Sequence, residues 1–111
     1  MAGFVAGDVV VVPFPFTDLQ SHKVRPAVVV AAFTRGDILI CQITSRTGGH
    51  PAVIPINTTD FASGALPVAS QALPHRIVTA NETCVRKVAG KLTPAKLTEI
   101  REAICAAVRQ G

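Results

Sequence analysis

The amino-acid sequence is divided into short runs of β-branched and small apolar residues, separated by glycine, proline, aspartate and asparagine. The clearest runs are Val9–Val12, Pro26–Ala31 and Asp37–Thr44. Runs of this length and composition favour strands over helices, and the first two read as strands buried on both faces. A turn signal, Gly36-Asp37, precedes the third run, which predicts an antiparallel hairpin with the second.

The middle of the chain continues the pattern less regularly. A short strand is expected over Pro51–Ile56, at an edge or bulge because of its prolines. Residues 57–65, "NTTDFASGA", are predicted to form a loop. Two strands are expected over Leu66–Leu73 and Ile77–Ala80, joined by a turn at residues 74–76, and another over Val85–Leu92. About five to seven strands with a turn roughly every 8 to 12 residues are typical of a small barrel.

The last segment has a different period. Thr93 and Pro94 are suited to the N-cap and first position of a helix. Leu97, Ile100 and Ile104 then fall on one helical stripe, so a helix is predicted from about 94 to 109. The expected fold is therefore mainly β with a C-terminal helix, in one domain over residues 1–111.

Composition restricts the class of protein. Hydrophobic residues make up 49% of the chain, a surplus for 111 residues that suggests a dimer interface. No apolar run approaches the roughly 20 residues that span a bilayer, and no basic residue precedes the short apolar N-terminus. We expect a cytoplasmic protein with no membrane partner. Its three cysteines are too few and too scattered for a disulfide framework, so reduced thiols are predicted.

The positive charge is unevenly distributed. The formal net charge is +4, and residues 20–50 carry four basic residues, Lys23, Arg25, Arg35 and Arg46, against Asp37 alone. This excess favours an acidic or polyanionic partner.

Common catalytic motifs are missing from the sequence. There is no Gly-x-Ser-x-Gly elbow, no Cys-His pairing motif and no glycine-rich phosphate loop. The three histidines, His22, His50 and His75, lack the spacing and acidic companions of a zinc site. We therefore predict no metal and no cofactor.

A different group of side chains gathers at strand ends. Arg25 opens the second run and Thr44 closes the third, so an antiparallel hairpin would make them neighbours. His22, Lys23 and Arg46 lie close by in the sequence and could converge on the same edge. Such a site suits RNA cleavage, because RNA carries its own 2′-OH nucleophile. Arginine would stabilise the charged pentavalent phosphorus.

Five segments, taken in order, resemble a known family. They are "GDVVVVPFPF" (7–16), "RPAVVV" (25–30), "QITSR" (42–46), "IVTA" (77–80) and "VAGKL" (88–92), followed by the predicted helix. Together they resemble the MazF/PemK family of type II toxins, which are sequence-selective, mRNA-cleaving endoribonucleases. The resemblance extends from about residue 6 to residue 108.

The resemblance implies an SH3-like, largely antiparallel barrel and a homodimer whose interface helps to form an RNA groove. It implies that Arg25 and Thr44 are catalytic and that the Phe14–Val24 connection covers single-stranded RNA and contributes to sequence choice. Cleavage in the family needs no metal and leaves a 2′,3′-cyclic phosphate and a 5′-hydroxyl. A cognate antitoxin protein inhibits such a toxin by occupying the same groove.

The acid and base roles cannot be copied from the family, because this connection reads "TDLQSHKV". His22, which titrates near neutrality, is our candidate for a catalytic proton carrier, and Asp18 is a second substitute. The predicted RNA-binding residues are Phe16, Thr17, Asp18, Ser21, Lys23, Ser45 and Arg46.

Two alternatives belong to other functional classes. The first is a toxin that acts by binding, like gyrase-poisoning relatives of the same barrel whose C-terminal helix ends with a tryptophan. This chain ends "AAVRQG" and contains no tryptophan. The second is a barrel without activity that serves only as a binding module, which the retention of Arg25 and Thr44 disfavours.

Overall fold

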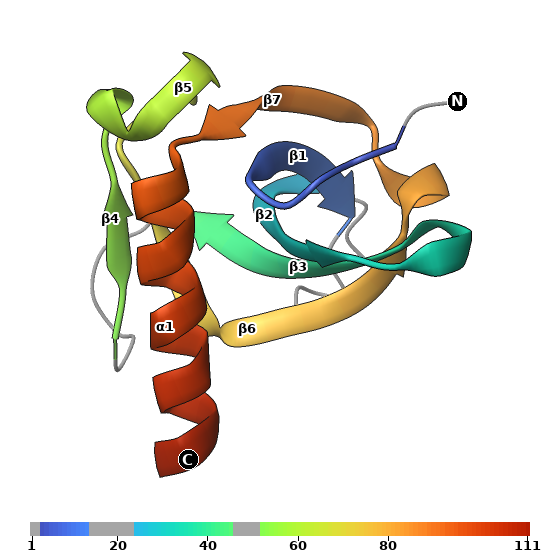
Figure 1. Ribbon diagram of the computed structural model, residues 1–111. Coiled ribbons are helices and arrows are strands. Elements are labelled where there is room, and N and C mark those ends of the chain that lie inside the picture. The colour runs from blue at the N-terminus through green and yellow to red at the C-terminus, as the bar shows by residue number, and fades with distance from the viewer. Residues whose placement is uncertain (1–2, 14–23, 46–51) are drawn as a thin grey trace.

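The structure is a computed structural model, described here for residues 3–13, 24–45 and 52–111 (Figure 1). It contains one curled antiparallel sheet and one C-terminal helix. The strands are β1 (Asp8–Pro13), β2 (Val24–Ala32), β3 (Asp37–Thr44), β4 (Ile54–Ile56), β5 (Phe61–Gly64), β6 (Ser70–Asn81) and β7 (Lys87–Leu92). The helix α1 covers Pro94–Gln110, and three short 3-10 turns are η1 (Thr34–Gly36), η2 (Thr58–Asp60) and η3 (Glu82–Cys84).

The strands pair in the order β4-β6-β3-β2-β1-β7-β5, and every pair is antiparallel. Figure 1 shows the sheet curling so that β6 and β7 arch around opposite sides of β1, β2 and β3. The result is a half-barrel with α1 against one side. The predicted mainly β fold with a C-terminal helix is therefore confirmed.

The predicted first hairpin is also confirmed. The runs expected over 9–12, 26–31 and 37–44 are β1, β2 and β3, and β2 pairs antiparallel with β3. The turn between them is η1, where Arg35 and Gly36 have positive φ values of 64° and 79°. Glycine adopts this backbone conformation at little cost, which explains the turn signal in the sequence.

Two expectations for the middle of the chain are wrong. Residues 70–81 form one strand, β6, rather than two strands separated by a turn at 74–76. The pairing with β3 shifts between Cys41↔Ile77 and Ile43↔Ala72, so residues 73–76 are accommodated as a bulge that contains Pro74. A proline is tolerated there because a bulge interrupts the ladder of backbone hydrogen bonds.

The predicted loop over 57–65 is the second error, since it contains η2 and β5. Asn57 and Asp60 form a capping box around η2, with the Asn57 N–H donating to Asp60 Oδ2 at 2.7 Å. β5 then pairs with β7 at Gly64 and Gly90, where the backbones approach too closely for side chains. The strand expected over 51–56 is shorter than predicted, because only residues 54–56 form β4 and position 51 lies outside the described residues.

The two faces of the sheet bury separate apolar clusters. The first cluster includes Val28, Val30, Cys41 and Ile43 and is covered by Ile100 and Ile104 of α1, among others. The second cluster lies on the opposite face and consists of Val10, Val12, Ala27, Val29, Ile38 and Ile40. Because successive residues of a strand point to opposite faces, both valine-rich strands contribute to both clusters. The expected burial on two faces is thereby explained.

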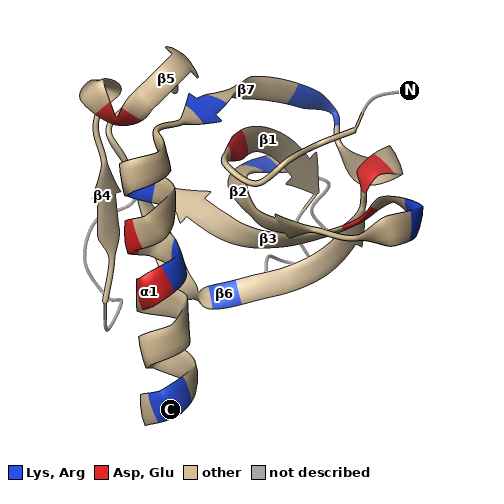
Figure 2. Cartoon of the chain, viewed as in Figure 1, with Lys and Arg blue, Asp and Glu red and all other residues tan. Residues whose placement is uncertain are grey.

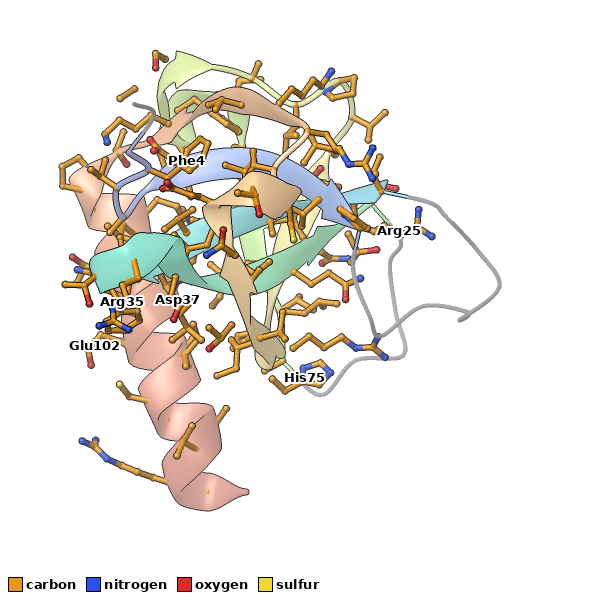
Figure 3. All side chains as sticks on the ribbon, turned by 90° about the vertical axis from the view of Figure 1, so that its right-hand side faces the viewer. Phe4, Arg25, Arg35, Asp37, His75 and Glu102 are labelled. Carbon is orange, nitrogen blue, oxygen red and sulfur yellow. The ribbon has the colours of Figure 1, made fainter. Side chains whose placement is uncertain are left out.

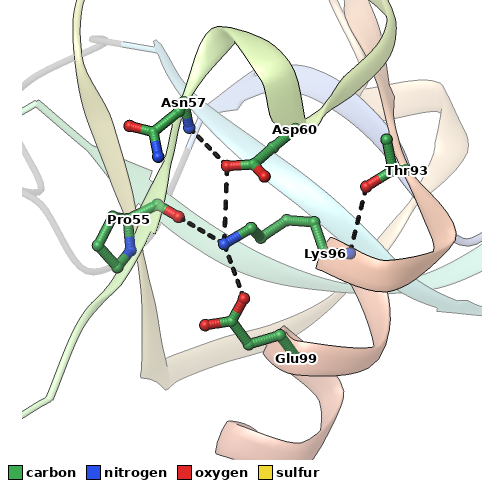
Figure 4. A network of polar contacts seen from close by, with 6 residues as sticks. All are labelled: Pro55, Asn57, Asp60, Thr93, Lys96 and Glu99. Carbon is green, nitrogen blue, oxygen red and sulfur yellow. Dashed lines mark hydrogen bonds and ion pairs between the residues drawn. The ribbon is translucent and has the colours of Figure 1, made fainter.

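The helix begins as predicted, with the Thr93 hydroxyl accepting from the Lys96 N–H and Pro94 in the first turn. Lys96 also ties α1 to the β4–η2 segment (Figure 4). Its Nζ donates to the Pro55 carbonyl at 3.0 Å and to Glu99 Oε1 at 2.7 Å, and lies 3.6 Å from Asp60 Oδ2. Across residues 3–13, 24–45 and 52–111, no helix combines the length and apolar character needed to cross a membrane.

Cys41, Cys84 and Cys105 are free thiols, in agreement with the sequence-based prediction. Cys41 is buried, whereas the other two are exposed. Burial raises the pKa of the Cys41 thiol to about 12, although its hydrogen bond to the Leu73 carbonyl, at 3.1 Å, acts in the opposite direction.

Candidate active site at one end of the central strands

Strand pairing brings the two main candidate residues together. The β2–β3 register ends at the pair Ala27–Gln42, and both strands continue beyond it, to Arg25 in β2 and to Thr44 in β3. The same register, continued by two residues, sets Arg25 opposite Thr44. On its other side Arg25 pairs with Val12 of β1, and Thr44 pairs with Gln71 of β6. The expected proximity of Arg25 and Thr44 is therefore provided by the central strands themselves.

Arg25 and Thr44 also lie on the same face of the sheet. Arg25 alternates with Ala27 and Val29 along β2, and Thr44 alternates with Ile40 and Ile38 along β3. All four of those apolar residues belong to the second cluster, so both candidates continue that face to its polar end. Arg25 is half-buried there, which limits the directions its guanidinium can take.

Other polar residues extend the same face. Gln42 lies between Ile40 and Thr44 on β3, is only 5% exposed, and its Oε1 has no hydrogen-bond partner among the described residues. Gln71 is the partner of Thr44 on β6, and Arg76 lies in the neighbouring bulge of β6. Thr44, Gln71 and Arg76 each take part in at least one interaction.

The charge distribution favours an anion at this end. The described residues of β6, β3, β2 and β1 include two acidic residues. These are Asp8 at the start of β1 and Asp37 at the start of β3, both at the opposite end of the strands from Arg25. Figure 2 shows basic residues at the start of β2, in β6 and along β7. Figure 3 shows Arg25 and His75 on one side of the molecule, with Phe4, Arg35 and Asp37 on the other. A phosphate near Arg25 would therefore meet little repulsion from these strands.

Ser45 does not share this face. It lines a groove of about 510 Å³ together with Val11, Val24, Pro26 and Val88, among other residues. Val11 and Pro26 alternate with residues of the second cluster, so the groove opens on the opposite face of the sheet. The predicted RNA contact of Ser45 consequently needs an RNA strand that passes around the sheet end.

The remaining candidates lie outside the described residues. They are Phe16, Thr17, Asp18, Ser21, His22, Lys23 and Arg46. Their roles stay predictions from the sequence.

Residues 6–108 match the model of the PemK-like, MazF-like toxin of type II toxin-antitoxin systems. The chain belongs to this family. The match covers nearly the whole chain, including the Arg25–Thr44 pair and α1. Comparison with curated protein sequences gave no match.

Solved structures share the fold at low sequence identity. MazF (Form-I) from Deinococcus radiodurans is similar with a TM-score of 0.75 and 20% identity, over 97% of this chain and 98% of that chain. MazE-MazF (Form-II) from the same organism gives a TM-score of 0.73 at 18% identity, over 97% of both chains. An endoribonuclease in complex with its cognate antitoxin from Mycobacterial species gives 0.71 at 18% identity, over 97% and 95%.

Sequence reasoning missed two polar residues of this face, Gln42 and Gln71, and Arg76 in the neighbouring bulge. For Gln42 a signal was present, because it is the polar residue two positions before Thr44 in the apolar run "DILICQIT". Alternation alone would have placed it beside the candidate site. Arg76 was missed because the sequence predicted a turn over residues 74–76, whereas these residues belong to a bulge in β6.

Proposed function

We propose that this family member is a toxin that acts as a metal-independent, sequence-selective endoribonuclease on single-stranded mRNA. The observation that supports the proposal is that β2 and β3 run on from the Ala27–Gln42 pair to Arg25 and Thr44, on one face of the sheet and at the end of these strands without a described acidic residue. Family membership supports it, as does the shared fold with structures described as endoribonucleases.

The chemistry needs few protein groups. The RNA 2′-oxygen attacks the adjacent phosphorus, the O2′–P bond forms, and the bond from phosphorus to the 5′-oxygen breaks. One proton leaves the 2′-hydroxyl and one reaches the departing 5′-oxygen, so the products are a 2′,3′-cyclic phosphate and a 5′-hydroxyl. The Arg25 guanidinium would stabilise the additional charge on the phosphoryl oxygens, and the Thr44 hydroxyl would orient the same group.

Proton transfer and base recognition are assigned to residues outside the described part. We propose His22 as the proton carrier, because imidazole titrates near neutrality. We propose that Phe16 stacks on a base and that Lys23 and Arg46 contact phosphates, with further contacts from Thr17, Asp18, Ser21 and Ser45.

A cognate antitoxin and a second copy of the chain are the proposed protein partners. Structures with the same fold are described as complexes with a cognate antitoxin or with MazE. An antitoxin segment rich in acidic residues would compete with RNA for the basic end of the sheet. A cytoplasmic location agrees with an mRNA substrate.

The test is incubation of the purified protein with a long RNA in EDTA, followed by mapping of the fragment ends. We expect cuts at one short recurring sequence, with a 5′-hydroxyl on each downstream fragment. Arg25→Ala should lower the single-turnover rate by about 10²- to 10³-fold, as for loss of one preorganised donor.

Arg35→Asn is the matched control. It removes one positive charge from the opposite side of the molecule, and asparagine tolerates the positive φ at this position. Its cleavage rate should remain within about twofold of wild type, because an exposed charge this far away is largely screened. Intact RNA with the wild-type protein would overturn the proposal, and inhibition of gyrase by the same preparation would instead support the binding-toxin alternative.

A further inference from the structure

Gln42 is the feature of the site that catalysis by Arg25 and Thr44 leaves unexplained. Its side chain is 95% buried, since 5% is exposed, and its Oε1 has no partner within the described residues. A buried acceptor without a hydrogen bond typically costs about 1–3 kcal/mol of stability. An apolar residue at position 42 would avoid this cost, as Ile38 and Ile40 do on the same face. The oxygen is therefore a candidate acceptor for a donor that reaches it when the site is occupied.

The register brings Arg25 within reach of this oxygen. Gln42 pairs with Ala27, and Arg25 lies two residues along β2 on the same face, which makes Gln42 and Arg25 diagonal neighbours. Diagonal neighbours lie about 7–8 Å apart, a separation that long side chains can span. Arg76, in the bulge of β6, takes part in another interaction.

The free protein does not require the contact, because Arg25 is only half-buried and so keeps access to solvent. Bound RNA would remove that water. Arginine has five N–H donors in a fixed fork, and a phosphate accepts at most two of them in a bidentate pair. The remaining donors would then need acceptors inside the covered site.

We infer that Gln42 is a positioning residue, whose Oε1 accepts a hydrogen bond from the Arg25 guanidinium when RNA covers the site. This contact would fix the plane of the fork so that its other edge faces the scissile phosphate. The inference rests on the proposed endoribonuclease function.

Gln42→Met tests the inference, because methionine keeps the length of the side chain and removes its oxygen. Single-turnover cleavage should slow about tenfold to a hundredfold, as expected for loss of one hydrogen bond to a charged group. Binding of an uncleavable 2′-deoxy oligonucleotide and the cut-site sequence should not change. The melting temperature should stay equal or rise, since an unpaired buried oxygen is removed.

Ile40→Met is the matched control, because it changes the same face of β3 without changing any polar atom. It should leave the cleavage rate within about twofold of wild type. If Gln42→Met fails to fold, Gln42→Leu replaces it. A Gln42→Met variant that cleaves at the wild-type rate would overturn the inference. So would weaker oligonucleotide binding or a changed cut site, since either would mean that Gln42 contacts RNA directly.

A second readout does not depend on cleavage. In NMR spectra of the complex with the 2′-deoxy oligonucleotide, exchange of the Arg25 guanidinium protons with water should be slowed in the wild type and not in Gln42→Met. Equal exchange in the two proteins would overturn the inference. If wild-type protein leaves RNA intact, the proposed function fails, and this measurement still decides whether Gln42 holds Arg25.

Discussion

Replacing Lys96 with methionine should destabilise the protein by about 2–3 kcal/mol, through loss of the link between α1 and the β4–η2 segment. The Lys96 side chain is 10% exposed and its partner Asp60 is 20% exposed. Removing one partner of a buried ion pair typically costs about 3–5 kcal/mol. A loss below this range applies here because both side chains are partly exposed and Nζ and Oδ2 are 3.6 Å apart. Methionine retains most of the aliphatic stem, so little packing is lost.

The contact with Glu99 should contribute much less, although its distance is only 2.7 Å. The Glu99 side chain is 50% exposed, and exposed pairs are worth about 0–1 kcal/mol. Glu99→Gln is therefore the control, with an expected loss below about 1 kcal/mol. For a domain of 111 residues, Lys96→Met should lower the melting temperature by about 8–12 °C, at roughly 4 °C per kcal/mol.

The assay is urea denaturation followed by circular dichroism, supported by a thermal melt at low and at high salt. The Lys96→Met effect should persist at high salt, because partly buried charges are screened much less than exposed ones. A loss below about 0.5 kcal/mol would refute the reasoning, since that is the range of ordinary surface substitutions. It would also be refuted if Glu99→Gln were as costly as Lys96→Met.

Three further predictions concern the core, the β5–β7 contact and the start of α1. At pH 8 the Cys41 thiol should resist alkylation until the protein is unfolded, because burial raises its pKa to about 12, while the exposed thiols of Cys84 and Cys105 react. Rapid labelling of Cys41 in the native protein would contradict this. Gly64→Ala should cost at least about 2 kcal/mol in urea denaturation, because φ is +70° and a Cβ would overlap the Ala89 carbonyl; a neutral effect would disprove the close approach. Thr93→Ala should cost about 1 kcal/mol and Thr93→Ser much less, so equal losses would exclude the hydroxyl cap.

Local patterns explain why the sequence predicted the hairpin and the helix. The β2–β3 pairing follows from two apolar runs and one turn signal, and it places Arg25 beside Thr44 without other information. The helix follows from Thr93, Pro94 and the apolar stripe, all of which act within a few residues. These elements depend on interactions close in sequence, which periodicity and capping describe well.

The errors involve interactions between distant segments. Residues 74–76 have the composition of a turn, but β3 pairs on both sides of them and keeps β6 continuous. β5 is polar and contains glycine, and it becomes a strand only because β7, more than 20 residues further along, offers Gly90 as a partner for Gly64. The sequence also did not show which candidate residues lie on which face of the sheet. Ser45 was expected beside Thr44, and only the packing of each face shows that it lines the opposite groove.

The meeting of Arg25 and Thr44 depends on main-chain ladders in the middle of a sheet, flanked by β1 and β6. Peptide groups form such ladders whatever side chains they carry, provided each strand keeps its register and its buried face. Sequence changes can therefore replace most of the surface and much of the interior while these two side chains keep their places in the sheet. This tolerance accounts for a backbone shared with structures at only 18–20% identity.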